Sequence, residues 1–315
     1  MWNSYAREPF VRAARGGVRS TRAFALACAL FAGFWSPSAE ACAACGCGDP
    51  TLVAAGTEQP FAGRLRASLE LRYRTDAVGE PGVDELSIRE GRADVSLAWA
   101  PLSSLFVMAT LPFVHRSVED PSLAIERTWG PGEAELRAKW FFFRDRELAA
   151  RWLIAANVGV KLPTAPFRDD AAGEPLPLEA QTGTGSFDAL FGPSVALVEG
   201  NFSAYASAQL SVPLVVRDEL APGLSLRSTL ALQWQPLPWL ALRPALDARW
   251  DGKSEEHGRA DRDSGGFVLF AGGDVLLSPL TDLTFSAGAR APIWQALDGF
   301  HDEGPVVMLA AALDF

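Results

Sequence analysis

The sequence lacks any apolar run long enough to cross a membrane as a helix, and residues that commonly carry catalysis are scarce. Its longest apolar run, Ala23–Trp35, has about thirteen residues, whereas a spanning helix needs about twenty. Three histidines and four cysteines occur among the 315 residues. These shortages exclude a helical membrane bundle and leave few candidates for a metal or acid–base centre.

Positive charge is also in short supply. The chain has 28 Lys and Arg against 38 Asp and Glu, which gives a net charge of −10. Removal of residues 1–41 would take away five Arg and two Glu and leave a net charge of −13. An acidic chain of this kind argues against a nucleic-acid partner, which would need a basic surface.

The short apolar run has the surroundings of a secretory signal peptide. It is preceded by Arg7, Arg12, Arg15, Arg19 and Arg22, and it is followed by the small-x-small sequence Ala39-Glu40-Ala41. A basic segment, an apolar segment and a small-residue cleavage site are the three parts of such a peptide. The sequence therefore predicts a signal peptide over residues 1–41 and export of the remaining chain.

Three of the cysteines would then lie at the start of the exported chain, in a periplasmic tail over residues 42–60. Cys42, Cys45 and Cys47 are close enough for two of them to form a disulfide in an oxidising compartment. Their thiolates would also suit zinc or copper(I), with a periplasmic redox or metal partner. Both interpretations stay open, and no cofactor is expected for the rest of the protein.

From Phe61 to Phe315 the chain alternates between apolar and polar residues in stretches of about ten. In the first stretch, one face carries Leu65, Ala67, Leu69, Leu71 and Tyr73, and the other carries arginines and Glu70. Because successive side chains of a strand point to opposite faces, this period indicates strands with one apolar face.

The alternation predicts about twelve strands. Short and long connections follow one another, as in outer-membrane barrels with short periplasmic turns and long extracellular loops. We therefore predict an all-β fold, a transmembrane antiparallel up-and-down β-barrel over residues 61–315. A bulge is expected in the second strand, where the parity changes. The predicted strands are 61–75, 86–100, 104–117, 130–144, 149–163, 185–198, 201–214, 223–235, 239–251, 265–278, 281–294 and 304–315.

Aromatic residues support a membrane-spanning barrel because they gather at both ends of the predicted strands. Amphipathic rings are favoured at the level of the lipid headgroups. One group, near the short turns, is Trp99, Trp140, Trp152, Trp234 and Trp239; the other, near the long loops, is Tyr73, Phe113, Trp250 and Trp294. Phe315 at the end of an alternating strand resembles the carboxy-terminal signal of outer-membrane barrels, which implies recognition by the barrel-assembly machinery and localisation in the outer membrane of a Gram-negative bacterium.

The charged face of the strands would line the lumen, because Arg or Lys facing lipid at the midplane costs about 2–4 kcal/mol. This parity makes the lumen wall rich in basic residues and favours a channel for polar or anionic solutes. Salt bridges that fill a narrow barrel are the alternative. The predicted pore-lining residues are Arg64, Arg66, Glu70, Arg72, Arg74, Glu133, Glu135, Arg137, Lys139, Arg151, Lys161, Arg227, Arg243, Asp247, Arg249 and Arg290.

Several short motifs resemble the outer-membrane transporters of the MetA-pathway phenol-degradation family. They are Gly130–Glu133 (GPGE), Gly159–Thr164 (GVKLPT), Gly183–Asp188 (GTGSFD) and Pro292–Gln295 (PIWQ) with Asp298-Gly299. Two positions depart from the family's usual residues, since Ala165 replaces a Gly and Glu133 replaces an Asp. The resemblance implies a barrel that passes small molecules, including small aromatic ones.

Enzymatic activity is not predicted. His115 and Ser117 have the H-x-S spacing of outer-membrane phospholipases and share the apolar parity of Leu111 and Phe113, but Val118 and Glu119 stand where that family has Asn-Gly. The orienting polar residue of a nucleophilic pair is therefore missing. The other two histidines, His257 and His301, fall in predicted loops. A channel or transporter is the predicted function, and an interaction barrel with a cysteine tail is the alternative.

Overall fold

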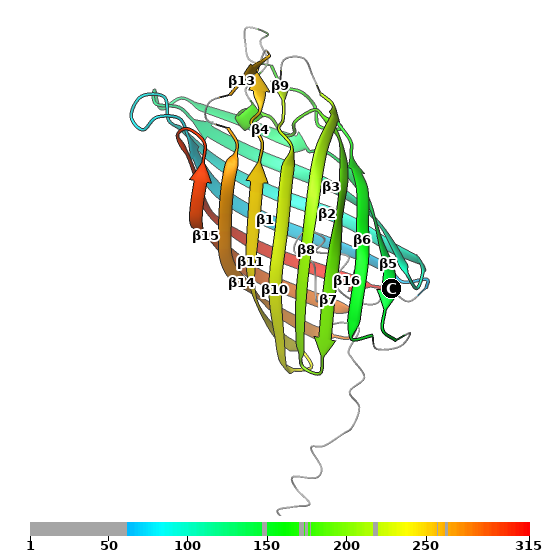
Figure 1. Ribbon diagram of the computed structural model, residues 1–315. Helices are drawn as coiled ribbons and strands as arrows, with labels where there is room; N and C mark the ends of the chain where they lie inside the picture. Colours follow the sequence, from blue (N-terminus) through cyan, green and yellow to red (C-terminus); the bar gives the residue numbers. More distant parts are fainter. Residues whose placement is uncertain are drawn as a thin grey trace, which may run out of the picture. The chain divides into compact units, whose positions relative to one another are not determined.

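A single antiparallel sheet closes on itself to form the barrel (Figure 1). The computed structural model describes residues 62–146, 150–169, 173, 176, 178–216, 220–256, 258–261 and 264–315. The predicted signal peptide and the cysteine tail lie outside these residues and stay predictions. The strands of the barrel are β1 (Leu65–Val78), β2 (Leu86–Leu102), β3 (Leu105–Glu119), β4 (Ile125–Pro131), β5 (Glu135–Arg144), β6 (Trp152–Lys161), β7 (Phe187–Glu199), β8 (Phe202–Val215), β10 (Ser225–Leu237), β11 (Leu240–Asp251), β14 (Gly266–Leu280), β15 (Leu283–Leu297) and β16 (His301–Asp314).

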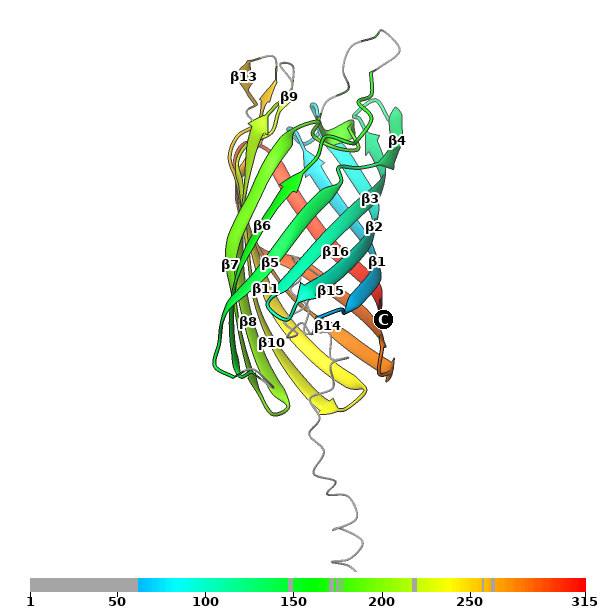
Figure 2. The same cartoon turned by 90° about the vertical axis from the view of Figure 1, so that its right-hand side faces the viewer.

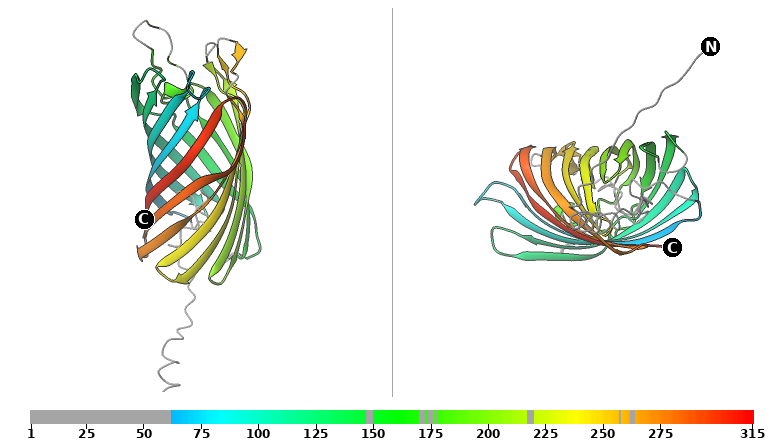
Figure 3. Two further views of the ribbon diagram at one scale, coloured as in Figure 1. Left: turned by 90° about the vertical axis from the view of Figure 1, so that its left-hand side faces the viewer. Right: turned by 90° about the horizontal axis from the view of Figure 1, so that it is seen from below.

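Each strand pairs with its neighbours in the chain, and the first strand also pairs with the last. β1 pairs with β2 on one side and with β16 on the other, where Leu69 lies opposite Ala311. Because β4 and β5 follow one another along the same part of the wall, the ring has twelve positions. The blue β1 and the red β16 lie side by side in Figure 3. Closure leaves no open sheet edge around the ring, as a bilayer requires. The predicted fold class is confirmed.

Connections at one end of the barrel are mostly short, and most of those at the other end are longer (Figure 2). We call these the turn end and the loop end. The loop end contains the connections 79–85, 120–124, 162–186, 216–224, 252–265 and 298–300, whereas the turn end contains 103–104, 145–151, 200–201, 238–239 and 281–282. Two of the long connections meet in a small sheet of β9 (Leu220–Ala221), β12 (Glu255–Glu256) and β13 (Arg259–Ala260).

The outer face of the wall is apolar and the inner face is polar, as the alternation predicts. In β1, Leu71 is 45% exposed on the outside, whereas Arg66 on the inside is 4% exposed. The apolar outer face exposes large side chains on every side, including Leu97, Leu136, Val158 and Leu309. A water-soluble barrel would not expose so much apolar surface, so the strands span a membrane. The described residues contain no helix long and apolar enough to cross a bilayer.

Aromatic side chains mark the two ends of this apolar surface. At the turn end, Trp99, Trp140 and Trp239 are each more than half exposed. At the loop end, Trp294 is 60% exposed and Tyr73 is 49% exposed. These positions agree with the two predicted aromatic belts.

One predicted strand, 130–144, is divided in two. β3 pairs with β5 up to Thr110 and with β4 from Phe113 onward. Between these segments the Pro112 carbonyl accepts a hydrogen bond of 2.8 Å from Gly132 N, and proline itself has no N–H to donate to the ladder. A Cβ on Gly132 would lie 2.9 Å from Pro112 Cγ. The partner of β3 therefore changes from β5 to β4 at this close contact between Gly132 and Pro112, and the strand begins earlier than predicted, at Ile125.

The expected bulge in the second strand is wrong. The β1–β2 register runs without a shift from Leu65 opposite Trp99 to Val78 opposite Leu86. Ile88 instead points inward and is 5% exposed, in an apolar cluster with Val118 and Ala180. The parity changes because this end of the inner wall contacts a loop segment. His301, which was predicted in a loop, is the first residue of β16.

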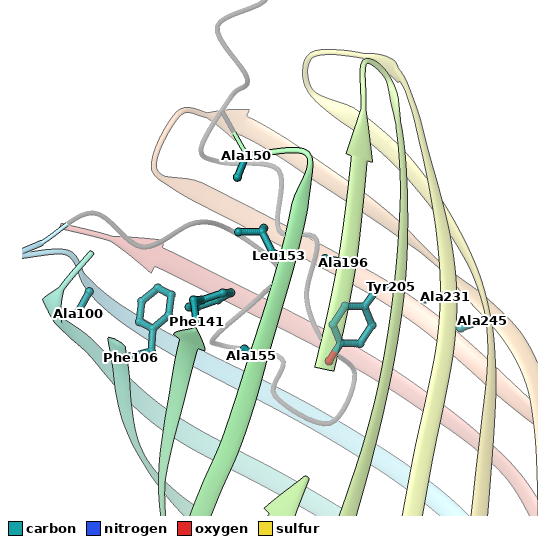
Figure 4. Close-up of a cluster of buried hydrophobic side chains, with 10 residues drawn as sticks. All are labelled: Ala100, Phe106, Phe141, Ala150, Leu153, Ala155, Ala196, Tyr205, Ala231 and Ala245. Carbon is teal, nitrogen blue, oxygen red and sulfur yellow. The ribbon is translucent and has the colours of Figure 1, made fainter. Parts of the chain in front are cut away.

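Small and aromatic side chains form a second apolar cluster, near the turn end of the wall (Figure 4). Phe106 and Phe141 meet edge to face with ring centroids 6.5 Å apart. Lys139 Nζ lies 5.4 Å from the ring centroid of Phe141 and 5.5 Å from that of Tyr205. The cluster comprises Ala100, Phe106, Phe141, Ala150, Leu153, Ala155, Ala196, Tyr205, Ala231 and Ala245.

Candidate functional site: a charged cavity in the barrel lumen

The inner wall encloses a cavity of about 490 Å³. Its charged lining comes from strands all round the barrel, and three residues of the long 162–186 connection, Thr182, Gly183 and Thr184, complete it. Apolar side chains also reach it, among them Met108, Phe270 and Met308. The cavity is thus a mixed polar and apolar chamber within the lumen.

Eleven of the sixteen residues predicted to line a pore surround this cavity. They share inward parity, and they come from strands that are far apart in the sequence. They are Glu70, Arg72, Arg74, Glu133, Glu135, Arg137, Lys161, Arg227, Asp247, Arg249 and Arg290.

The other five predicted residues lie away from the cavity. Arg64 and Arg66 both bind Asp314, with Nη2–Oδ2 distances of 2.8 and 2.7 Å, where β1 meets β16. Arg243 Nε lies 2.9 Å from Asp274 Oδ2 and is buried. Lys139 lies against the rings of Phe141 and Tyr205 in the apolar cluster described above, and Arg151 forms an ion pair with Glu199 beside a short turn.

Charges in the cavity are almost balanced, although the sequence predicted a basic wall. Nine basic and seven acidic side chains line it. The acidic residues that the sequence analysis missed are Glu90, Asp94 and Glu303, and the missed basic residues are Arg92 and Arg116. Four of these five lie in β2 or its neighbour β3. The alternation of Glu90, Arg92 and Asp94 was visible in the sequence, but the opposite parity suggested by Ile88 obscured it.

Most of the basic side chains are held by carboxylates in a ladder of ion pairs. Arg72 Nη2 lies 2.6 Å from Glu70 Oε1, and Arg92 Nε lies 2.7 Å from Asp94 Oδ1. Glu90 binds both Arg74, at 3.1 Å, and Arg116. Further along the ring, on β15, Arg290 bridges Asp247 at 2.7 Å and Asp274 at 2.9 Å. Such pairs satisfy buried charges and fix the wall, because an unpaired buried charge is costly.

The long connection 162–186 contributes a short helical turn, η2 (Leu178–Ala180), to the inside of the barrel mouth. Arg116 Nη1 donates to the carbonyls of Glu179 at 3.1 Å and Gln181 at 2.6 Å, and Thr128 Oγ1 donates to the carbonyl of Ala180 at 2.7 Å. The Gln181 side chain is fully buried. This segment, residues 178–186, is therefore bonded to the inner wall and narrows the lumen at the loop end.

Three of the short motifs noted in the sequence meet beside this segment. Lys161 Nζ lies 2.9 Å from Glu133 Oε2 and 2.8 Å from Asp188 Oδ2. The same Glu133 accepts hydrogen bonds from Gly185 N at 2.5 Å and Thr184 Oγ1 at 3.0 Å. Gly130–Glu133, Gly159–Thr164 and Gly183–Asp188 thus form one hydrogen-bonded network at the mouth.

A metal site would need ligands in one place, and the described ranges contain no cluster of three or more His, Cys, Asp or Glu that could hold an ion. Cys42, Cys45 and Cys47 lie outside those ranges. Metal binding by these cysteines therefore remains a prediction.

Searches against known protein families and against curated proteins found no match. Solved structures do match. An outer-membrane channel from Pseudomonas putida F1 superimposes with a TM-score of 0.63 at 14% identity, over 85% of this chain and 100% of that one. Weaker matches include the translocator domain of the autotransporter NalP from Neisseria meningitidis, with a TM-score of 0.46 at 12% identity over 82% of this chain and 90% of that one. The CymD monoaromatic hydrocarbon channel gives 0.41 at 10% identity, over 82% and 90%.

At such low identity, the match to the Pseudomonas putida protein bears on fold alone. It covers that chain from end to end and agrees with the barrel predicted from the sequence. The protein is a twelve-stranded β-barrel with the fold of an outer-membrane channel.

Proposed function

We propose that the protein is a passive channel for small molecules in the outer membrane of a Gram-negative bacterium. The observation that carries the proposal is the charged cavity of about 490 Å³ inside a barrel whose outer face is apolar. Lining charge and pore width set selectivity in such channels. The turn end then faces the periplasm and the loop end faces the outside, as in bacterial barrels.

The ion-pair ladder and the bound segment 178–186 suit a narrow pathway. Because most lining cations are neutralised by neighbouring carboxylates, electrostatic selectivity for anions is weak. A cavity of about 490 Å³ is large enough for a small organic molecule. The eleven predicted residues at the cavity form its lining. The other five predicted residues stabilise the barrel wall and its turn end; they are Arg64, Arg66, Lys139, Arg151 and Arg243.

The proposed channel has no catalytic step. The protein passes solutes without chemical change, so His115 on the outer face takes no part in catalysis. The exposed Phe315, whose N–H donates to the Leu65 carbonyl at 2.8 Å, is the residue through which the barrel-assembly machinery recognises the chain. The resemblance to the phenol-degradation family points toward small aromatic solutes.

Liposome swelling tests the channel directly. Proteoliposomes that contain the protein purified from outer membranes are diluted into isosmotic solutions of solutes of increasing size. Swelling with glycerol and small amino acids, and none with a trisaccharide, is expected. Liposomes that swell with none of the solutes, although the protein migrates as a folded barrel on unheated gels, would overturn the proposal.

A further inference from the structure

One basic side chain in the cavity stands apart from the ion-pair ladder. Arg227, on β10, has no hydrogen bond or ion pair with any residue in the part of the chain that the structure describes. It is exposed to the lumen rather than packed against the wall. The two carboxylates that act electrostatically on Arg227 are each bound to another arginine, since Asp251 lies 2.7 Å from Arg249 and Glu135 forms an ion pair with Arg137.

The strand register places a second cation directly beside Arg227. Arg227 is the cross-strand partner of Arg249 on β11, and like charges in directly opposite positions destabilise a sheet. Arg249 forms ion pairs with Asp251 and Glu303, whereas Arg227 forms none with a described residue. A bound anion would reduce the repulsion between Arg227 and Arg249. The arrangement is therefore more stable with an anionic ligand than without one.

On its other side Arg227 faces a polar neighbour that has a donor to offer. Gln209 on β8 is its cross-strand partner. The Gln209 Oε1 atom accepts a hydrogen bond of 2.7 Å from Arg137 Nη1. Because its carbonyl oxygen is occupied, the amide N–H₂ of Gln209 is the group left to bind a ligand, and an amide N–H₂ is a donor. An anion at Arg227 would therefore meet donors from both strands.

We infer that Arg227, with Gln209 beside it, anchors an anion-binding subsite in the lumen whose ligand is a small organic monocarboxylate. A planar guanidinium binds a carboxylate through two parallel hydrogen bonds. A single cation without an ion pair of its own matches a single negative charge better than a dianion such as phosphate. Met108, Phe270 and Met308 line the same cavity and provide apolar surface for the rest of the ligand. The inference rests on the proposed channel function and names its solute class.

Equilibrium dialysis of radiolabelled benzoate against the purified protein at low salt measures this subsite without any flux. Saturable binding of one equivalent is expected, and Arg227→Gln should weaken it about tenfold or more, as loss of a charge-assisted pair implies. Arg227→Lys keeps the positive charge but cannot form the two parallel hydrogen bonds of a guanidinium. It should therefore bind benzoate less tightly than the wild type and more tightly than Arg227→Gln. Lys253→Gln, a loop substitution that removes the same charge, serves as the matched control and should bind as the wild type does.

Competition in the wild-type protein gives a test that needs no variant. Neutral benzamide should fail to displace benzoate, and phosphate should displace it less well than unlabelled benzoate does. Displacement by benzamide as effective as that by benzoate, tighter binding of phosphate, or unchanged binding in Arg227→Gln would each overturn the inference. If the wild-type protein binds benzoate but its liposomes do not swell, the proposed channel is wrong and the subsite stands. If the liposomes swell but the protein does not bind benzoate, the subsite is wrong and the channel stands.

Discussion

The Lys161 ammonium lies 2.8 Å from the Asp188 carboxylate and 2.9 Å from that of Glu133. The three side chains are largely buried, with at most 14% of each exposed. One cation therefore pairs with two acids that come from different parts of the chain, and it does so where the segment 178–186 rejoins the barrel wall.

Replacement of Lys161 by Met should destabilise the barrel by about 3 kcal/mol, because two buried carboxylates lose their cation. The free energy of unfolding in urea, followed by gel mobility of unheated samples, measures the change. Lys161→Arg retains the charge and is the control. Equal stability of the Met variant and the wild type would show that Glu133 and Asp188 are satisfied by other donors.

The segment 178–186 should open when its bonds to the wall are removed. Thr128→Val deletes the 2.7 Å hydrogen bond to the Ala180 carbonyl at nearly constant side-chain volume. Arg116→Gln has a shorter side chain and loses the hydrogen bonds to the Glu179 and Gln181 carbonyls. The double variant combines both substitutions. Both variants should raise the single-channel conductance and speed cleavage of the segment by added protease. Arg127→Gln, an outward change on the same strand, should alter neither property. Unchanged conductance in the double variant would mean that the segment does not narrow the path.

The β1–β16 seam depends on the two arginines that share Asp314. Asp314→Asn keeps the shape and removes the charge from both pairs, so it should lower the stability of the barrel by about 2 kcal/mol, a typical value for charge-assisted hydrogen bonds. Thermal unfolding of the purified protein, monitored by circular dichroism, provides the measurement. Asp282→Asn, in the neighbouring short turn, is the control with the same change of charge. A loss that is no larger in Asp314→Asn than in the control would contradict a special role for the seam.

The turn at residues 145–151 should depend on pH. Hydrogen bonds from the Trp152 and Arg151 backbone N–H groups, at 3.0 and 2.8 Å, hold the pKa of Asp145 below its usual value. A lowered folded-state pKa means that the carboxylate stabilises the turn above the unfolded pKa and loses this effect as the pH falls through the folded pKa.

Hydrogen exchange of the Arg151 and Trp152 amides should therefore, after correction for intrinsic rates, show less protection at pH 3 than at pH 6. In Asp145→Asn, which cannot titrate, the protection should not change with pH. The same pH dependence in both proteins would assign the effect to another group.

Side-chain alternation was sufficient to predict the wall of the barrel from the sequence. Leu71 and Arg72 are neighbours that point to opposite faces of the strand. Because lipid requires an apolar side chain and the lumen accepts a charged one, the sequence of each strand shows which face is turned outward. Partner choice is harder to predict, because the change from β5 to β4 at Pro112 depends on a close approach to Gly132 that no local pattern encodes.

The inside of the barrel was only partly predictable. The inward parity of Arg72 and Arg137 was clear, but the compensation of each by Glu70 and Glu135 depends on side-chain conformations and on the register between strands. Thr182 and Thr184 have the composition of an ordinary solvated loop. Their position against the cavity results from hydrogen bonds of residues 179–184 to Arg116, Thr128, Pro131 and Glu133, each of which spans more than fifty residues of the chain.

Ion current through the protein in planar bilayers is the most direct test of the channel. The protein purified from outer membranes should give steady, small openings with weak anion preference in the reversal potential under a salt gradient, and Arg227→Glu should shift that preference toward cations. A bilayer that stays silent, although unheated gels show a folded barrel and incorporation is verified, would contradict an open path through the lumen.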